Sequence, residues 1–285
     1  MIKDYNIADI NIRVNSCVEY KNTEEFNPFV SNDMDDIDME VNIIGGNSII
    51  NFNKEPLYKN LTLKIYKEDN KLYRVVYMGN QNNILSYLVE NQQNSKEMKC
   101  EMYIDHYSKQ WNSWDIFSMI GFEYMLNLHN INILHSSFIS YKNKAIIFTA
   151  PSQSGKSTQA NLWQQYKNAE VVNGDRCAIK KVNNKWYAYG LPYAGTSLLY
   201  KNEKREIGAI VVLRQASKNI IKKLSKAEAF KYIYSETTIN FWNNEYVRRA
   251  SDTIEGLVNN VPVYMLHCLP NKEAVDLLKN ELQWG

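Results

Sequence analysis

The sequence predicts a mixed α/β (α+β) protein built from two parts, and three observations support this. The first third alternates short apolar segments with polar turns, as β-strands do. From about residue 109 onward, strand-like and helix-like segments alternate. A turn containing glycine and lysine joins a strand to a helix in the middle of this second part. We therefore expect a β-rich N-terminal domain at residues 1–108 and a second, α/β domain at residues 109–285.

Composition is that of an ordinary globular chain. The 285 residues are 45% hydrophobic and 22% charged, and the net charge of +2 gives no reason to expect nucleic acid or a membrane surface as a partner. No apolar run reaches the roughly 18 residues of a membrane-spanning helix, and the first residues contain no apolar signal segment. The four cysteines are far apart and form no Cys-x-x-Cys pair, so we expect free thiols and a cytoplasmic protein.

Five segments of the first domain have strand periodicity or β-branched content, and glycines at 45–46 and 79 mark turns. An acidic stretch at residues 33–40 lacks the glycine and distal glutamate of a calcium-binding EF-hand loop. We interpret it as a solvated loop or an edge strand. The five predicted strands cover residues 10–14, 41–44, 61–65, 72–77 and 98–103.

The second domain opens with one amphipathic helix, predicted for residues 111–129 from an apolar stripe at helical spacing. A strand over 131–141 follows and turns at Lys142–Asn143 into a short buried strand, Ala145–Thr149. Apolar residues at helical spacing from Ala160 to Tyr166 then predict a helix.

The segment between this strand and this helix is the main candidate for chemistry. A glycine-bearing turn there aims several backbone N–H groups and the positive end of the helix at one point, which suits a phosphate. Lys156 would reach the β- and γ-phosphates of a nucleotide, and the Ser157 hydroxyl would bind Mg²⁺. The predicted nucleotide-binding residues are Pro151, Ser152, Gln153, Ser154, Gly155, Lys156, Ser157 and Thr158.

This pattern departs from G-x-x-x-x-G-K-[ST] at one position, because Ala150 replaces the first glycine. A purely structural alternative is a lysine-bearing helix end of an ordinary α/β unit, with Ser154 as its N-cap. The strand before the turn and the helix after it are the context that a phosphate-binding loop requires, and they favour phosphate binding.

The rest of the chain continues the alternation. A strand at 170–179 has Asp175 near its exit, and a hairpin partner at 185–189 leads into a glycine- and proline-containing loop at 190–195. The apolar run 207–213 predicts a central strand. Helices at 226–236 and 243–258, a strand at 261–266 and a final helix at 271–282, with Asn271 as its N-cap, complete the domain.

Two further residues could take part in chemistry. Asp175 could bind a metal ion or act as a base, or could simply pair with Arg176 at a strand end. His135 lies on the strand expected beside the loop strand, although a lone histidine on a strand is more often structural.

The array His135-Ser-Ser, a hairpin, Pro151 to Thr158 and then Val-Val-Asn-Gly-Asp175 resembles the HPr kinase/phosphorylase family and the kinase homologues associated with peptide-modifying enzymes. The resemblance covers roughly residues 130–215, and residues 266–270 show a weaker similarity. It implies a P-loop domain related to phosphoenolpyruvate carboxykinase that phosphorylates a serine hydroxyl with ATP and Mg²⁺. It also implies that Lys156 binds phosphate, that Ser157 binds the metal, that Asp175 is the base or a metal ligand, and that His135 lies close by. Because HPr kinases form rings, a homo-oligomer is a further expectation.

Three departures from the family qualify these expectations. One acid is missing, because Gly174–Asp175 stands where HPr kinases have two adjacent aspartates. Ala150 replaces a glycine, and the HPr-binding signature is absent, so HPr is not the expected acceptor. The loop at 190–195 and the basic run 201–205 occupy the region that would face the acceptor, where a cation could stabilise charge, although a solvated turn is the simpler interpretation of the basic run.

Three functional hypotheses remain. The first is an ATP- and Mg²⁺-dependent kinase acting on a Ser/Thr hydroxyl of a peptide, protein or small metabolite. The second is a nucleotide-binding regulatory protein with lost or weak catalysis, suggested by the missing acid. The third is a carboxykinase-like small-molecule enzyme, which requires several arginines near the nucleotide. The candidates for that role are Arg176, Arg205, Arg248 and Arg249.

Overall fold

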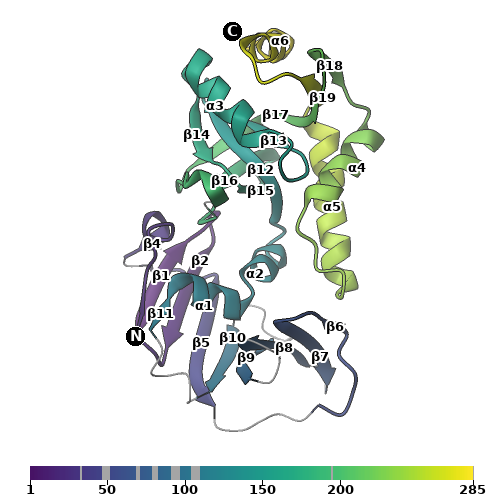
Figure 1. Ribbon diagram of the computed structural model, residues 1–285. Coiled ribbons are helices and arrows are strands. Elements are labelled where there is room, and N and C mark those ends of the chain that lie inside the picture. Colours follow the sequence, from purple (N-terminus) through teal and green to yellow (C-terminus); the bar gives the residue numbers. More distant parts are fainter. Residues whose placement is uncertain are drawn as a thin grey trace. The chain divides into compact units, whose positions relative to one another are not determined.

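A computed structural model describes residues 1–32, 34–46, 52–68, 71–78, 83–90, 97–103, 110–193 and 195–284. The protein is a mixed α/β protein, as the sequence predicts, and its chain divides into two compact units, Met1–Met125 and Leu126–Gly285 (Figure 1). Each unit is described by itself.

The first unit contains one large sheet in which the strand order is β4-β1-β2-β5-β10-β9-β8-β7-β6. All five predicted strands are present, with ends shifted by a few residues. Gly45 and Gly46 do not form the expected turn, because they end β5 and pair with Met102 and Tyr103 of β10. The turn predicted at Gly79–Asn80 lies outside the described residues. The strands are β1 Ile2–Asn6, β2 Asn11–Ser16, β4 Val30–Ser31, β5 Met39–Gly46, β6 Tyr58–Lys59, β7 Leu63–Glu68, β8 Lys71–Met78, β9 Asn83–Glu90 and β10 Glu97–Tyr103, and a separate pair joins β3 Tyr20–Lys21 to β11 Trp111–Asn112.

The acidic stretch at 33–40 is only in part the loop that the sequence predicts. Its last two residues begin β5, which lies inside the sheet between β2 and β10 and is therefore not an edge strand. The Asp38 carboxylate accepts the backbone N–H of Asn11 at 2.9 Å and so holds the segment against β2. Within the described part of the chain, no group of three or more His, Cys, Asp or Glu residues could hold a metal ion.

The single helix predicted for 111–129 is two helices, α1 Ser113–Ile120 and α2 Phe122–Leu128. Gly121 ends α1 because it adopts a left-handed conformation with φ of 71°, which the apolar stripe could not reveal. A Cβ at Gly121 would lie 3.1 Å from Nε of Arg74, so the close side chain also favours glycine here.

The division between the units follows Met125, later than the change of pattern near residue 108, which itself lies outside the described residues. The physical reason is the packing of α1. Phe117 contacts Tyr5 and Phe26, with ring centroids 5.0 Å and 4.7 Å away, so α1 belongs to the core of the first unit.

The second unit is organised around the loop strand β13 Lys144–Thr149. It pairs antiparallel with β12 Asn132–Tyr141 on one edge and parallel with β17 Lys204–Gln215 on the other. Strands β15 Arg176–Val182 and β16 Lys185–Gly190 join β12 back to β17, so these five strands close into a ring. The predicted central strand 207–213 is confirmed by its neighbours on both sides. The remaining strands are β14 Glu170–Asn173 beside β12, β19 Val263–Cys268 parallel to β17, and β18 Ile220–Lys223 at the outer edge.

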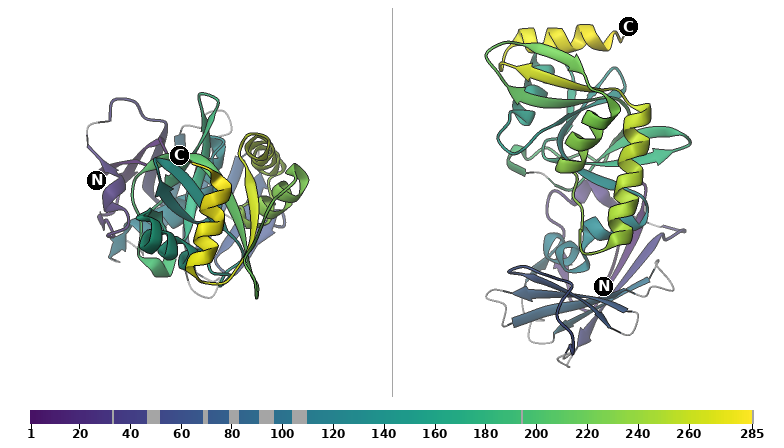
Figure 2. Two further views of the ribbon diagram at one scale, coloured as in Figure 1. Left: turned by 90° about the horizontal axis from the view of Figure 1, so that it is seen from above. Right: turned by 90° about the vertical axis from the view of Figure 1, so that its right-hand side faces the viewer.

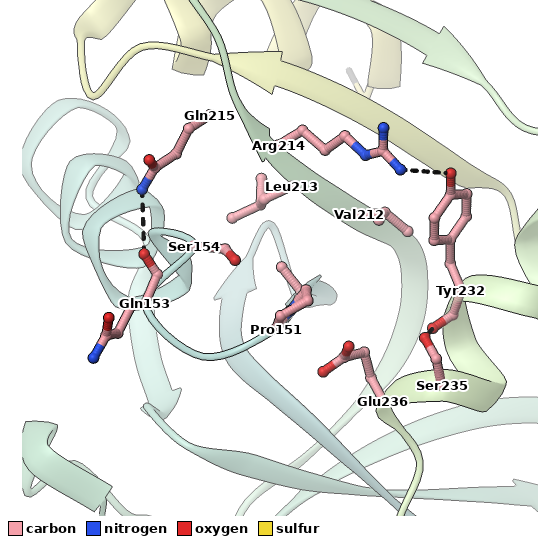
Figure 3. Close-up of a pocket in the computed structure, with 11 residues that line it drawn as sticks. Pro151, Gln153, Ser154, Val212, Leu213, Arg214, Gln215, Tyr232, Ser235 and Glu236 are labelled. Atoms are coloured by element: carbon pink, nitrogen blue, oxygen red, sulfur yellow. Dashed lines mark hydrogen bonds between the residues drawn. The ribbon is translucent and has the colours of Figure 1, made fainter.

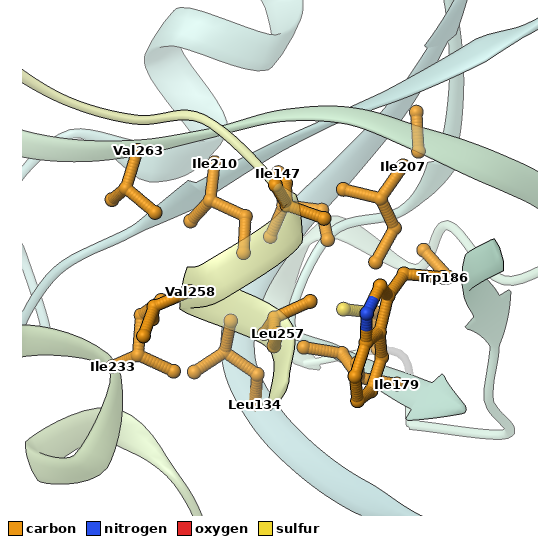
Figure 4. Packing of buried hydrophobic residues seen from close by; sticks show 14 of the residues in the cluster. Leu134, Ile147, Ile179, Trp186, Ile207, Ile210, Ile233, Leu257, Val258 and Val263 are labelled. Atoms are coloured by element: carbon orange, nitrogen blue, oxygen red, sulfur yellow. The ribbon is translucent and has the colours of Figure 1, made fainter. Parts of the chain in front are cut away.

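Alternation of side chains along β13 divides the core of the second unit into two clusters. Ile147 packs with residues of α4 Lys226–Glu236 and α5 Asn244–Asn260, as Figure 4 shows for Ile233, Leu257 and Val258. Its neighbours Ile146 and Phe148 pack in the other cluster, with α3 Lys156–Lys167 and α6 Lys272–Leu282. Helices α4 and α5 lie side by side in both Figure 1 and Figure 2. Helices thus pack against both sides of β13.

The last three helices, α4, α5 and α6, begin within one residue of the predicted positions. Asn271 caps α6 by accepting the N–H of Ala274, and Asn243 caps α5. Ser225 and Glu228 form a reciprocal capping box at the start of α4. None of the helices among the described residues is long and apolar enough to cross a membrane.

Candidate active site

The candidate loop joins the end of β13 at Thr149 to the start of α3 at Lys156. Its left-handed positions are Gln153, with φ of 65°, and Gly155, with φ of 98°. Ala150 is buried and is not in the left-handed region, so an alanine at this position does not strain the loop. Gly155, and not Ser154, is the N-cap of α3, and no side chain caps the helix. The structural alternative of a Ser154 cap is therefore wrong, and the first N–H groups of α3 have no side-chain acceptor.

Lys156 extends back under this loop. Its ammonium group donates to the carbonyl oxygens of Ala150 at 2.8 Å and Pro151 at 3.3 Å. The residue is only 7% exposed, and burial lowers the pKa of its ammonium group, while the charges of Glu236 and Asp175 oppose that shift. Among the described residues it forms no ion pair within 4.0 Å. Lys156 is therefore a largely desolvated cation that only neutral carbonyl groups contact directly.

Ser157 lies beside the turn that carries Asp175. Its hydroxyl is 3.5 Å from the carbonyl oxygen of Gly174, which also accepts a hydrogen bond from the Ser137 hydroxyl at 3.1 Å. The backbone N–H of Ser136 donates to the carbonyl of Asp175 at 2.9 Å, so β12 fixes the position of the turn. The structure thus brings the two predicted metal ligands into the same neighbourhood.

The single strand predicted for 170–179 is interrupted at this turn and becomes β14 and β15. The cause is Asn173, whose side-chain oxygen accepts the backbone N–H groups of both Asp175 and Arg176 at 2.9 Å. Asparagine side chains form such local turns readily. Here the bonds to Asn173 replace the strand-to-strand hydrogen bonds that a continuous strand would have made.

The segment after β16 closes over the turn. A Cβ at Gly174 would lie 1.9 Å from the Ser197 hydroxyl oxygen, so Ser197 occupies the space that a side chain at position 174 would need. A Cβ at Gly195 would lie 2.8 Å from Cβ of Asp175. The short 3₁₀ turn Gly195–Ser197 therefore packs directly on Asp175, and the predicted loop at 190–195 does approach the candidate site.

Asp175 pairs with its neighbour Arg176, with an Nε to Oδ2 distance of 3.5 Å. Arg176 also lies over the Tyr193 ring, 4.9 Å from its centroid. The Asp175 side chain is 30% exposed, so the carboxylate keeps access to solvent and to a ligand. Asp175 therefore pairs with Arg176 and also belongs to the turn beside Ser157.

His135 lies at the base of the loop. Its carbonyl oxygen accepts the Thr149 hydroxyl at 2.9 Å, and its ring Nδ1 lies 3.2 Å from Oε2 of Glu236. Glu236 is the last residue of α4. Figure 3 shows its carboxylate on the cavity side of that helix, near Pro151. Nothing in the local sequence marked Glu236, which is 101 residues away from His135.

A cavity of about 430 Å³ lies between the loop, the end of β17 and α4 (Figure 3). Arg214 donates to the Tyr232 hydroxyl at 3.0 Å on its far wall, and Gln215 ties β17 to the loop by donating to the carbonyl of Gln153 at 3.2 Å. Because β13 and β17 are parallel, the cavity lies at the carboxyl ends of both strands, where α/β proteins bind ligands. The residues that line it are Ala150, Pro151, Gln153, Ser154, Val212, Leu213, Arg214, Gln215, Tyr232, Ser235 and Glu236.

A second cavity, of about 380 Å³, borders the first turn of α3. Thr158 is exposed and faces it, together with Gln159 and the segment Cys268–Pro270 after β19. Thr158 therefore borders the second cavity and not the first, and Ser152 is exposed in the loop itself.

Other predicted cations do not reach the loop. Arg205 lies near the start of β17 and pairs with Glu203, whereas the loop lies at the other end of that strand. Lys201 pairs with Glu170, and Arg248 and Arg249 pair with Glu245 on α5. Of the four arginines considered from the sequence, only Arg176 lies at the site, and Arg214, which was not among them, lines the cavity.

Comparison with known proteins identifies no family for the chain. No protein-family model matches it, and no curated protein matches it. Among solved structures, the chain is similar to the Hpr(Ser) kinase/phosphatase from Coxiella burnetii. That match has a TM-score of 0.32 and 12% sequence identity, and it covers 53% of this chain and 92% of that chain.

Proposed function

We propose that this protein is an ATP- and Mg²⁺-dependent phosphotransferase that phosphorylates a Ser/Thr hydroxyl of a peptide, protein or small metabolite. The observation that carries the proposal is the environment of Lys156. This cation is buried beneath a loop between a parallel strand and an uncapped helix, with only carbonyl groups in contact with it.

The residues present fit a nucleotide triphosphate. A buried cation without a directly paired anion is costly, and a bound phosphate group offsets that cost. No side chain caps the first N–H groups of α3, and a helix N-terminus favours an anion as the partner of such groups. Bound ATP would supply the phosphoryl group. Lys156 would neutralise charge on the transferred group, and the loop from Pro151 to Gly155 would hold the neighbouring phosphate oxygens.

The residues also fit a magnesium ion. Hydroxyl and carboxylate oxygens suit Mg²⁺ as protein ligands. Ser157, whose hydroxyl lies 3.5 Å from the Gly174 carbonyl, and Asp175, the next residue after Gly174, provide one of each. Two protein ligands suffice for Mg²⁺ when phosphate oxygens and water complete its shell. Bound Mg²⁺ would offset charge on the phosphates, and Asp175, held by Asn173 and Gly195, would keep it in place.

A nucleotide-binding regulator is the second candidate, and one observation favours it. A side chain at position 174 would collide with Ser197 where it now lies, so the Gly174–Asp175 turn offers one carboxylate. Under this hypothesis Lys156 binds ATP and no phosphoryl transfer follows.

Measurement of ADP formation with Mg–ATP, against a panel of serine-containing peptides and hydroxy metabolites, separates these candidates. We expect ADP release that depends on one class of acceptor in the wild-type protein and disappears in Lys156→Ala and Asp175→Asn. Lys181→Ala, on the exposed far end of β15, is the matched control. Binding of ATP that requires Lys156, without transfer to any acceptor, would instead support the regulator. A wild-type protein that binds no nucleotide would contradict both.

A further inference from the structure

Glu236 is the one carboxylate that lines the cavity beside the loop, among the residues that the structure places there. It comes from the end of α4, far along the chain from both the loop and the Gly174–Asp175 turn. Its side chain is 13% exposed, and its charge acts on Lys156. A ligand in this cavity would therefore meet a carboxylate on one side and the phosphate-binding loop on the other (Figure 3).

Glu236 is also the partner of His135, at 3.2 Å from its Nδ1. A carboxylate can only accept a hydrogen bond, so this contact requires the proton of a neutral imidazole to be on Nδ1. The other ring nitrogen, Nε2, is then left with a free lone pair. A carboxylate that fixes the tautomer of a histidine in this way is the arrangement by which histidine bases are oriented.

We propose that His135 and Glu236 form the proton-accepting pair of this site. The acceptor hydroxyl would bind where the Glu236 wall of the cavity meets the partly exposed His135 ring, since Glu236 lines the cavity and His135 itself does not. Asp175 then serves as a metal ligand with Ser157 and is not the base. This assignment rests on the phosphotransferase function proposed above.

The proposed step transfers one phosphoryl group to the acceptor and one proton to His135. As the acceptor oxygen forms its bond to the γ-phosphorus of ATP, its proton passes to Nε2 of His135. The bond between the γ-phosphorus and the bridging oxygen breaks, and ADP leaves with that electron pair. The imidazole becomes a cation, and the Glu236 carboxylate beside it stabilises that charge.

The location of the pair favours this division of roles. Asp175 follows Gly174, whose carbonyl lies beside Ser157, whereas Glu236 lines the cavity. The cavity, at about 430 Å³, is of a size that takes a small molecule or one side chain of a peptide. Three charged groups bear on the pair: Lys156, whose pKa responds to Glu236 and Asp175; Arg176, which lies opposite His135 in the strand pairing; and Arg214, across the cavity from Glu236.

The first test is structural and needs no acceptor. Long-range ¹H–¹⁵N correlation spectra of the histidine rings, recorded at about pH 8, distinguish the neutral tautomers and report which nitrogen carries the proton. We expect His135 to be protonated on Nδ1 in the wild-type protein and to lose that preference in Glu236→Gln, because an amide can donate as well as accept. Glu255→Gln, on the exposed face of α5, is the matched control. A wild-type ring protonated on Nε2 would overturn the proposal.

The second test uses turnover. We expect His135→Asn to lower kcat about 10²-fold, with the KM for Mg–ATP unchanged. Glu236→Gln should lower kcat by about 10-fold or more, and Glu236→Asp should recover part of that loss. The double variant should be no slower than His135→Asn, because Glu236 acts through the imidazole.

The outcomes distinguish a failure of the His135–Glu236 assignment from a failure of the phosphotransferase function. Active wild-type protein whose kcat is unchanged in His135→Asn, or falls independently in the two single variants, would overturn the pair and leave the phosphotransferase intact. Wild-type protein with the expected tautomer but no acceptor-dependent ADP release would contradict the phosphotransferase function, and with it the proton-accepting role of the pair.

Discussion

The ammonium group of Lys156 donates a 2.8 Å hydrogen bond to the carbonyl oxygen of Ala150, the residue that replaces the first glycine of the loop pattern. The contact shows why alanine is tolerated there. What the loop uses at this position is the carbonyl group, and the left-handed backbone occurs instead at Gln153 and Gly155.

Lys156→Met should abolish nucleotide-dependent turnover without unfolding the protein. Removing the cation takes away charge stabilisation of the transferred phosphoryl group, and we expect a loss of about 10²-fold or more in kcat/KM for Mg–ATP. The methionine is similar in length and has no desolvated charge, so the thermal midpoint should not fall. Kinetics and thermal melts of this variant beside Lys181→Met provide the measurement. An unchanged kcat/KM in Lys156→Met would contradict the role assigned to the lysine.

Gly195→Ala should displace Asp175. The added Cβ would come within 2.8 Å of Cβ of Asp175, and residue 195 has φ of 53°, which disfavours any side chain. If Asp175 binds Mg²⁺, titration of activity with Mg²⁺ should show a higher half-saturating concentration, by about 10-fold. Gly256→Ala, on α5, is a comparable glycine substitution far from the turn in sequence. A loss of activity that excess Mg²⁺ does not relieve at all would argue against metal binding at Asp175.

Cys177 should resist alkylation in the folded protein. It is completely buried on β15, and burial raises the pKa of its thiol to about 12, although a hydrogen bond from Ser136 opposes the shift. At about pH 8 the reactive thiolate is therefore scarce as well as shielded, and labelling by iodoacetamide should be at least about 10³-fold slower than at exposed Cys17. Peptide mapping of labelled protein measures both sites. Equal labelling rates in the native state would show that β15 opens readily.

Asp276→Asn should weaken the second unit in a pH-dependent manner. Asp276 on α6 pairs with Lys167 at the end of α3 and with Lys272, and these hydrogen bonds lower the pKa of its carboxyl group to about 2. A lowered pKa means that the stabilisation is present above the unfolded pKa of about 3.9 and disappears as the pH falls through about 2.

For this partly exposed pair we expect a loss of about 0.5–1 kcal/mol in unfolding free energy near pH 7. Chemical denaturation of wild type and Asp276→Asn at several pH values measures it. The two proteins should converge as the pH approaches about 2. A difference that persists unchanged at that pH would show that the effect is not due to the ionised pair.

Much of the second unit could be predicted from local patterns. The loop strand, the helix after it, the central strand at 207–213 and the cap at Asn271 are each specified by residues close together in the chain, through side-chain period, glycine and capping chemistry. The breaks in the helix at Gly121 and in the strand at Asn173 were missed. Each depends on one residue's backbone conformation or side-chain hydrogen bond, which periodicity does not register.

In the candidate site too, some residues could be predicted from the sequence and others could not. The sequence by itself determined the residues of the loop, because backbone N–H groups, a lysine and a serine must be contiguous to surround a phosphate. Only the tertiary structure decided that Ser197 fills the space at Gly174, that Arg205 lies away from the loop, and that Glu236 meets His135. These relationships join residues from different strands and helices. The five-strand ring of β12, β13, β15, β16 and β17, with α4 packed against it, brings them together.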